Sequence, residues 1–356
     1  MTCRRAVRRS LLRRGDRTSP AGTTVVTTGK GRTANSVSEG EGAFPSPFPQ
    51  GGGDMATYTN PVYARDFPDP HVLFFKGRFY AYATHSSGYD FQVMESPDLV
   101  HWTHRGSAFR PPWSGEHLWA PEVIQYRGSL YMTYSARNPQ TGKHDIGIAI
   151  GSNPLGPFQH RAILVRGDDN RVGVIDATIF LDRDGTPYLI YSEEDPRAIV
   201  LRRMSSDLLK ASAEKSVLLR PDRDWEKGIT EAPTMLYRGG TYYLFYSGGW
   251  FQSYKRDACY AVAYATSRSL KGPYVKAERI LQTVPGKVYN PGHQCLVRLP
   301  SGEMWMLYHA WDDQNEPLYG SNPLGRTLWL DKVLWKDGKP FVDGPSTEPR
   351  PVPRIQ

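Results

Sequence analysis

The most regular pattern along the chain is a pair of apolar runs joined by a glycine turn, which occurs five times. The five segments are HVLFFKGRFYAYAT (71–84), EVIQYRGSLYMTYSA (122–136), TIFLDRDGTPYLIYSE (178–193), TMLYRGGTYYLFYSG (234–248) and CLVRLPSGEMWMLYHA (295–310). Each has an apolar run, a two-residue turn signal ending in Gly and an aromatic-rich run, which predicts a tight β-hairpin. The turn glycines are Gly77, Gly128, Gly185, Gly240 and Gly302, at intervals of 51, 57, 55 and 62 residues.

A further strand pattern, ending in a Ser, Asn or Pro turn, follows four of these hairpins. It reads FQVMESPDLVHW (91–102), IGIAIGSNPLGPF (146–158), IVLRRMSSDLL (199–209) and YAVAYATSRSLKGPY (260–274). The fifth unit lacks a clear copy and ends in GRTLWLDKVLWKDGKPFV (325–342), whose strands would close a ring. Units of this length are typical of four-stranded propeller blades. The sequence therefore predicts an all-β fold, a five-bladed β-propeller; a β-sandwich with accidental hairpin similarity is the alternative.

Composition agrees with many short strands and tight turns. The 356 residues include 21 Tyr, 9 Trp, 34 Gly and 29 Pro. The three cysteines cannot form a paired framework, and no run approaches 18 apolar residues, so neither a disulfide scaffold nor a membrane-spanning helix is expected. We expect a catalytic propeller domain over residues 55–346 and a Pro-rich tail over 347–356.

Most of the net charge of +8 lies before the first unit, because residues 1–54 carry a net charge of +5. This basic extension is rich in Gly, Ser, Thr and Pro without apolar periodicity, which predicts disorder. Three interpretations stay open for it: a native basic extension, an organellar transit peptide, or an upstream extension of a chain that starts at Met55. It has no secretory h-region and no aromatics among its arginines, so we expect a cytoplasmic protein with neither nucleic acid nor membrane as partner. The sequence does not indicate an oligomeric state.

The propeller prediction brings several polar residues to one place. The first strand of every blade lines the central channel in the same direction, so the residues just before these strands meet at one mouth. Counting nine residues back from each turn glycine, and eight in the first unit for Asp69, gives Pro68, Asp69, Trp119, Asp176, Glu231 and His293. Each alone has a structural explanation, but crowded carboxylates repel one another and raise at least one pKa, which is typical of catalytic sites. Glu122 lies three positions deeper and is expected to be structural, pairing with a neighbouring blade.

Carboxylates beside an aromatic platform suit glycoside hydrolysis, in which one carboxylic acid protonates the leaving oxygen and a carboxylate activates water or attacks carbon. Trp119, Trp250 and Phe251 are the candidates for stacking on a sugar ring. The chain has no P-loop, GxGxxG, HExxH, paired CxxC or GxSxG motif. Phosphoryl transfer, dinucleotide redox chemistry and serine hydrolysis are therefore not supported.

Six motifs together resemble glycoside hydrolase family 43. They are TNPVYARDFPDPHVLFFKGRFYAYAT (59–84), LWAPEVI (118–124), VIDATIF (174–180), EAPTMLYRGGTYYLFYSGGW (231–250), NPGHQCLV (290–297) and GRTLWLDKVLWKDGKPFVDGPS (325–346), in the order of that family. The resemblance covers residues 59–346 and implies a five-bladed β-propeller, in agreement with the repeat. It also implies hydrolysis of arabinose- and xylose-containing plant polysaccharides with inversion.

The resemblance also implies a role for each site residue. Asp69 would be the general base, Glu231 the general acid, and Asp176 the residue that tunes and orients the acid. His293 matches a histidine beneath the sugar that in some members ligates a structural Ca²⁺ in the channel, and Arg326 matches an arginine aimed at the sugar. No cofactor is required for the reaction. Some members carry an extra C-terminal β-sandwich, and from the Pro-rich tail we expect this module to be absent here.

The expected partner is an oligosaccharide or polysaccharide substrate, and the sequence leaves open which sugar is released from it. An α-L-arabinofuranosidase or β-xylosidase is the leading prediction, and an endo- or exo-α-1,5-arabinanase is the alternative. A non-catalytic sugar-binding propeller would not need three carboxylates at one rim, and a retaining fructosidase would carry an NDPNG-like first motif that DFPDPHV does not match. We expect the loops at 104–118 and 247–258 to select the substrate.

Overall fold

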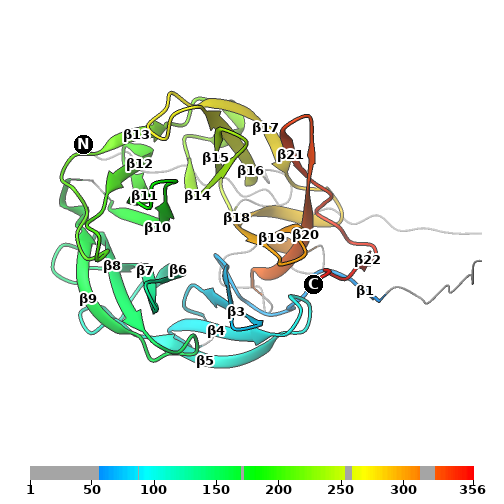
Figure 1. Cartoon of the computed structure of the whole chain (residues 1–356), viewed down its shortest axis with the longest axis horizontal. Coiled ribbons are helices and arrows are strands. Elements are labelled where there is room, and N and C mark those ends of the chain that lie inside the picture. Colours follow the sequence, from blue (N-terminus) through cyan, green and yellow to red (C-terminus); the bar gives the residue numbers. More distant parts are fainter. Residues whose placement is uncertain (1–55, 87, 170–171, 253–258, 313–324) are drawn as a thin grey trace, which may run out of the picture. The chain divides into compact units, whose positions relative to one another are not determined.

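The structure is a computed structural model that describes residues 56–86, 88–169, 172–252, 259–312 and 325–356. These residues form five four-stranded antiparallel sheets around a common axis, together with one two-stranded sheet (Figure 1). The prediction of an all-β, five-bladed β-propeller is confirmed. The predicted disordered extension, 1–54, lies outside the described residues. In the described part of the chain, no helix is long and apolar enough to cross a membrane.

Each blade is built from one continuous stretch of chain. Blade 1 contains β2 (His71–Phe75), β3 (Arg78–Ala83), β4 (Phe91–Ser96) and β5 (Thr103–Phe109). Blade 2 contains β6 (Trp119–Tyr126), β7 (Ser129–Arg137), β8 (His144–Gly151) and β9 (Gln159–Val165). Blade 3 contains β10 (Val174–Leu181), β11 (Pro187–Glu194), β12 (Arg197–Arg203) and β13 (Ser216–Leu219). Blade 4 contains β14 (Glu231–Arg238), β15 (Thr241–Gly248), β16 (Ala261–Ser267) and β17 (Val275–Leu281).

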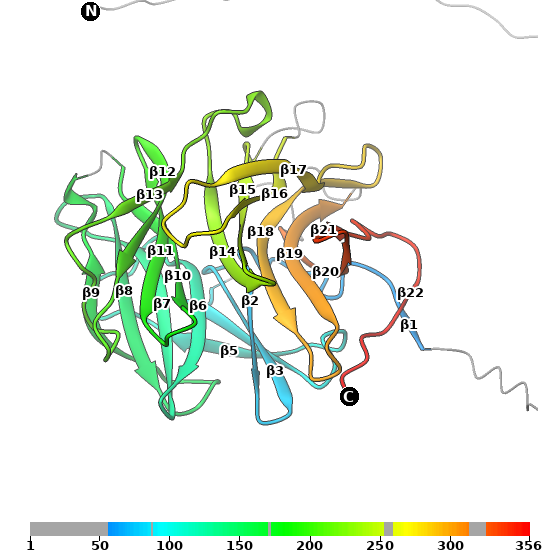
Figure 2. The same ribbon diagram turned by 45° about the horizontal axis from the view of Figure 1, so that its top comes forward.

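Blade 5 completes the ring with β18 (Val288–Arg298), β19 (Met304–Asp312), β20 (Thr327–Lys336) and β21 (Lys339–Val342). Segment 325–342, expected to close the ring, supplies its third and fourth strands. The five first strands contact one another in the order β2, β6, β10, β14, β18 and back to β2. Figure 1 shows the fourth strands β5, β9, β13 and β17 at the outside of the ring, and Figure 2 shows the same ring tilted. All five predicted hairpins and all four predicted third strands are present.

Two details of the sequence prediction are wrong. The turns around Gly185 and Gly302 hold five residues rather than two, because Leu181 pairs with Pro187 and Arg298 with Met304. Residues 104–109, expected in a rim loop, belong to strand β5, so only 110–118 form the connection to blade 2. Residues 247–248, expected in the other rim loop, belong to strand β15.

The hydrophobic core is divided into five clusters, one between each pair of neighbouring blades. Tyrosines of the second strands contribute to four of them and are almost completely buried: Tyr82, Tyr134, Tyr191, Tyr246 and Tyr308. Because both faces of each sheet are covered, these strands are buried at nearly every position, as in β15. Truncating one such ring to Ala would cost about 3–5 kcal/mol.

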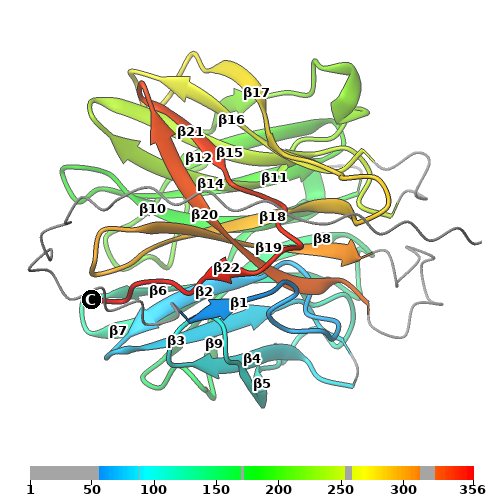
Figure 3. The same ribbon diagram turned by 90° about the vertical axis from the view of Figure 1, so that its right-hand side faces the viewer.

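The ring is closed by side-chain packing and by the segment that precedes blade 1. Asn60 pairs with the backbone of Leu330 in β20, accepting from its N–H and donating to its carbonyl, each at 2.9 Å. The Val62 amide donates to the Leu328 carbonyl at 2.9 Å. Strand β1 (Thr57–Tyr58) pairs antiparallel with β22 (Arg350–Pro351), as Figure 3 shows beside β20. Both ends of the described chain are thus attached to blade 5.

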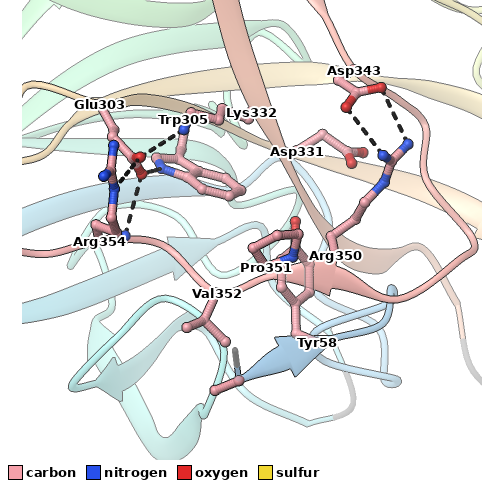
Figure 4. A pocket seen from close by; sticks show the side chains of 11 residues that line it. Tyr58, Glu303, Trp305, Asp331, Lys332, Asp343, Arg350, Pro351, Val352 and Arg354 are labelled. Atoms are coloured by element: carbon pink, nitrogen blue, oxygen red, sulfur yellow. Dashed lines mark hydrogen bonds and ion pairs between the residues drawn. The ribbon is translucent and has the colours of Figure 1, made fainter. Parts of the chain in front are cut away.

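A cavity of about 490 Å³ lies where these end segments meet blade 5 (Figure 4). We call it the terminal seam; its lining residues are Ala56, Tyr58, Glu303, Trp305, Asp331, Lys332, Asp343, Arg350, Pro351, Val352 and Arg354. Its charges neutralise one another, since Lys332 Nζ lies 2.6 Å from Glu303 Oε1 and Arg350 Nη1 lies 3.1 Å from Asp343 Oδ2. We interpret the terminal seam as a structural contact.

Candidate active site

Each blade has a left-handed residue just before or near the start of its first strand, and the first strand of blade 5 holds a second one, Asn290. The five at corresponding positions are Asp69, Ala120, Asp176, Ala232 and His293, with φ between 43° and 56°. In blades 2 to 5 the pairing of the first and second strands shifts register at or beside this residue. A left-handed residue costs about 1–2 kcal/mol when it is not glycine, so its recurrence in every blade marks structurally equivalent positions.

This equivalence corrects the count from the turn glycines. A two-residue turn joins the first strand to the second strand in blades 1, 2 and 4. A five-residue turn joins these two strands in blades 3 and 5. The nine-residue count therefore falls on the left-handed position in blades 3 and 5 but one residue before it elsewhere. Trp119 and Glu231 occupy that preceding position, as does Pro68, while Asp69 is the true equivalent in blade 1.

A cavity of about 350 Å³ lies at this mouth and brings together most of the predicted residues. It is lined by Asp69, His117, Trp119, Ile175, Asp176, Glu194, Arg197, Glu231, Phe251, Gln252, His293 and Arg326. Trp250, which the sequence predicts as a sugar contact, is not among them, and it is 51% exposed. Of the two predicted rim loops, 110–118 contributes His117, and 247–258 contributes Phe251 and Gln252, with 253–258 outside the described residues.

Four neighbours hold the Asp69 carboxylate and backbone. Arg326 Nη1 lies 2.8 Å from Oδ1, and the Thr84 hydroxyl donates to Oδ2 at 2.6 Å. His293 Nδ1 lies 3.3 Å from Oδ1, and the Asp69 amide donates to Nδ1 of His309 at 3.1 Å. Burial alone would raise the pKa of Asp69, but the Arg326 guanidinium and then His293 hold this pKa well below its ordinary value. Asp69 is therefore ionised at neutral pH.

Asp176 and Glu231 are in the opposite electrostatic state. Burial, followed by repulsion from Glu231 and Asp69, raises the pKa of Asp176 well above its ordinary value. Burial also raises the pKa of Glu231, against the opposing effects of Arg197 and Tyr260. The Tyr260 hydroxyl donates to Glu231 Oε1 at 2.8 Å, and Arg197 Nη1 lies 3.3 Å from Oε2. The two carboxyls therefore titrate as a coupled pair that holds a proton under conditions in which Asp69 is ionised.

Aromatic rings form two walls of the cavity. Trp119 lies against His144, with ring centroids 4.0 Å apart, and stacks on His117 at 5.1 Å. On the other side, the Arg326 guanidinium lies over the Phe251 ring at 4.6 Å. Flat apolar faces beside polar groups suit a sugar ring, which has C–H faces and hydroxyl edges.

The described residues do not fit a calcium site around His293. They contain no group of three or more His, Cys, Asp or Glu side chains that could hold a metal ion. Ca²⁺ takes six to eight oxygen ligands, whereas His293 Nδ1 faces Asp69 at 3.3 Å. No catalytic step is therefore assigned to a metal.

Deeper in the channel, Glu122 contacts a neighbouring blade as predicted, with Oε2 3.9 Å from His71 Nε2. The pair is uncharged at neutral pH, since burial raises the pKa of Glu122 to about 8 and lowers that of His71 to about 3.

Sequence reasoning missed five residues that line the cavity: His117, Ile175, Glu194, Arg197 and Gln252. Glu194 ends β11 and Arg197 begins β12. In an antiparallel blade the third strand begins at the same edge as the first strand, so the connection from the second to the third strand also reaches the mouth. Applying that rule to the segment EEDPR (193–197) would have found both charged residues.

Comparison with known proteins now decides the family. The family model for glycosyl hydrolases family 43 matches residues 58–340. The chain belongs to this family. A solved structure described as a thermostable family-43 glycoside hydrolase is 35% identical, with a TM-score of 0.75 over 84% of this chain and 100% of the other. This family 43 member is accordingly a glycoside hydrolase.

Characterised relatives differ in the sugar named. The chain is 29% identical to the beta-D-galactofuranosidase xynD of Aspergillus niger, over 70% of this chain and 75% of the relative. It is 28% identical to the extracellular endo-alpha-(1->5)-L-arabinanase 1 of Bacillus subtilis, over 70% and 79% of the two chains.

Proposed function

We propose that this family 43 glycoside hydrolase releases arabinofuranosyl or xylosyl units from plant-derived polysaccharides or oligosaccharides by a single displacement with inversion. The observation that supports this proposal is the opposite protonation of carboxyls in one cavity. Asp69 is held as a carboxylate by Arg326, whereas burial keeps a proton on the pair of Asp176 and Glu231. An ionised base and a protonated acid at the same pH are what glycoside hydrolysis requires.

In the proposed reaction, Asp69 takes a proton from a water molecule whose oxygen attacks the anomeric carbon. The bond from that carbon to the leaving oxygen breaks, and Glu231 gives its proton to the leaving oxygen. Asp176 assists Glu231 in two ways. When the proton of the pair lies on Glu231, Asp176 is charged, and its negative charge favours this protonated form of the acid; Asp176 Oδ2 also accepts the Ala232 amide at 3.0 Å, which fixes the backbone next to Glu231.

Inversion agrees with the positions of Asp69 and Glu231 in two blades that are not adjacent. Asp69 precedes β2 in blade 1, and Glu231 begins β14 in blade 4, and these blades are not neighbours in the ring. Inverting enzymes need roughly 6.5–9.5 Å between the carboxyl groups to admit water, against about 5–5.5 Å in retaining enzymes. Mounting across the mouth favours the wider separation.

The substrate class is supported by the relatives. An arabinanase is among them, and a solved structure described as an endo-1,4-beta-xylanase from Bacteroides thetaiotaomicron is 28% identical with a TM-score of 0.68. An α-1,5-arabinanase activity is therefore the second candidate. The galactofuranosidase relative adds one more five-membered sugar ring to be tested.

The test is proton NMR of the first sugar released, recorded before mutarotation. The substrates are nitrophenyl α-L-arabinofuranoside, β-xyloside and β-galactofuranoside, with linear arabinan as the polymer. We expect hydrolysis of an arabinofuranoside or xyloside, and a product with the anomeric configuration opposite to that of the bond cleaved. A product of retained configuration, or a glycosyl ester trapped on Asp69, would overturn the assignment of Asp69 as base. Hydrolysis of none of the four would overturn the proposed substrate class.

A further inference from the structure

The connection between β11 and β12 reaches into the active-site cavity from blade 3. Glu194 and Arg197 lie opposite each other in the register of the two strands, at the two ends of this connection. Both residues line the cavity. The Arg197 side chain is only 21% exposed, although it lies at the end of a hairpin. A guanidinium that is mostly buried needs a carboxylate partner.

That partner is the acid. Arg197 Nη1 lies 3.3 Å from Glu231 Oε2, which is the one ion pair of Arg197 within the described residues. The other oxygen of Glu231 accepts the Tyr260 hydroxyl at 2.8 Å. Both oxygens of Glu231 thus accept a donor, Oε1 from Tyr260 at 2.8 Å and Oε2 from Arg197 at 3.3 Å. The longer contact makes Oε2 the oxygen that can carry and release the proton.

From this geometry, and resting on the function proposed above, we propose that Arg197 is a positioning residue for Glu231. It stabilises the carboxylate that forms on Glu231 as the proton passes to the leaving oxygen. The attraction between Arg197 and Glu231 is weak while Glu231 is neutral and becomes strong when its charge appears. An interaction that strengthens along the reaction lowers the barrier rather than merely binding the substrate.

The distribution of charge in the cavity supports this role. Glu231 is faced by Asp176 from β10, Asp69 before β2, Glu194 from β11, His293 from β18 and Tyr260 before β16. Without a cation, these carboxylates would make loss of the Glu231 proton costly.

Two arginines divide this cavity between the working carboxyls. Arg326 lies 2.8 Å from Asp69, and Arg197 lies 3.3 Å from Glu231. The shorter contact thus belongs to the group that is ionised from the start, and the longer one to the group that becomes ionised during the reaction.

The experiment replaces Arg197 with Met and compares pH–rate profiles of kcat/KM on two glycosides of the same sugar, one with a nitrophenyl leaving group and one with a sugar leaving group. Removing the cation should move the alkaline limb upward by about one pH unit. At neutral pH the rate on the sugar leaving group should fall about tenfold. The nitrophenyl substrate should lose less, because its leaving group needs less protonation. Arg197→Lys should restore part of both effects. Arg203→Met, an exposed arginine at the other end of β12, is the control and should change neither.

An alkaline limb that stays in place, or equal losses on the two substrates, would show that Arg197 only supports the fold. Thermal unfolding of each variant separates such a loss from misfolding. If Arg197→Met does not fold, Arg197→Gln gives the same comparison with a polar side chain. The proposed function is judged on the wild-type protein alone, so hydrolysis by the wild type with an unshifted limb in the variant rejects only the role of Arg197.

Discussion

The active-site cavity and the terminal seam are made from the same kinds of side chain, yet their electrostatics are opposite. Both contain a Trp, two or more carboxyls and two or more cations, and the terminal seam is the larger at about 490 Å³ against about 350 Å³. In the seam, Glu303 accepts from Lys332 at 2.6 Å and from Arg354 at 2.9 Å. In the active site, no cation among the described residues pairs with Asp176, which is 7% exposed.

The pKa values of the carboxyls beside cations record this difference. Burial would raise the pKa of Glu303, but hydrogen bonds from Lys332 and Arg354 lower it to about 2. Burial raises the pKa of Glu231 above its ordinary value even though Arg197 opposes it. Burial also raises the pKa of Asp331 in the seam, to about 6, but no neighbouring carboxylate in the described part of the chain contributes to that rise. Cavity size and polarity therefore do not identify the catalytic site in this fold. The distinguishing feature is an excess of like charge that the fold leaves unneutralised.

The largest expected effect comes from placing the same substitution in both cavities. Glu231→Gln should lower turnover by about 10²–10⁴-fold, because Gln cannot donate a proton to the leaving oxygen. Substrate binding, measured by calorimetry with a non-hydrolysed oligosaccharide, should persist. Glu303→Gln is the matched control and should leave turnover unchanged. Full activity of the Glu231 variant on sugar leaving groups would remove Glu231 as the acid.

The free energy of unfolding should distinguish the same two variants, with the larger loss at neutral pH in Glu303→Gln. Glu303→Gln should lower the free energy of unfolding by about 1–2 kcal/mol at neutral pH, because Lys332 and Arg354 lose a charged acceptor. The folded pKa of Glu303 is depressed to about 2, so its contribution is present above the unfolded pKa of about 4.3 and is lost as the pH falls between these values.

Glu231→Gln should behave differently with pH. The folded pKa of Glu231 is raised, so ionising it in the wild type costs stability as the pH rises above the unfolded value. The variant should therefore gain stability relative to the wild type with rising pH. Urea unfolding from pH 3 to pH 8 measures both trends, and parallel curves for the two variants would contradict the comparison.

A smaller effect is expected when one negative charge is removed beside the acid. Asp176→Asn should move the alkaline limb of the pH–rate profile downward by about one pH unit, because the charge that favours protonated Glu231 is lost. Asp343→Asn, in the terminal seam, should leave the profile in place. A uniform drop in rate without a shifted limb would assign Asp176 a positional role alone.

The fold was predictable because the repeat recurs with its turn glycine in every blade. The exact equivalence of positions was not, because the hairpin turns differ in length and Gly185 and Gly302 close five-residue turns. The carboxyls Asp69, Asp176 and Glu231 could be found because they lie within the repeated unit. Residues from other connections carry no repeated pattern, so Glu194 and Arg197 could have been found only from the order of strands within a blade.

Trp250 and Arg197 show the two directions in which a local pattern fails. Trp250 has the right residue type next to a site strand, but its side chain is half exposed and outside the cavity lining. Arg197 has no motif around it, and its contact with Glu231 spans 34 residues and a blade boundary. Contacts between blades depend on how sheets pack, which local sequence does not specify.

The left-handed residue at the mouth of each blade shows that the side-chain chemistry of this position can vary independently of its backbone conformation. Three of these positions carry Asp69, Asp176 and His293, while the other two carry Ala120 and Ala232 in the same backbone conformation. The alanines show that the backbone takes this shape without a functional side chain. Duplication of a blade would copy the position together with its hairpin, ready to receive a new residue. A ring built in this way can acquire or exchange reactive groups by single codon changes, without altering the pairing of its strands.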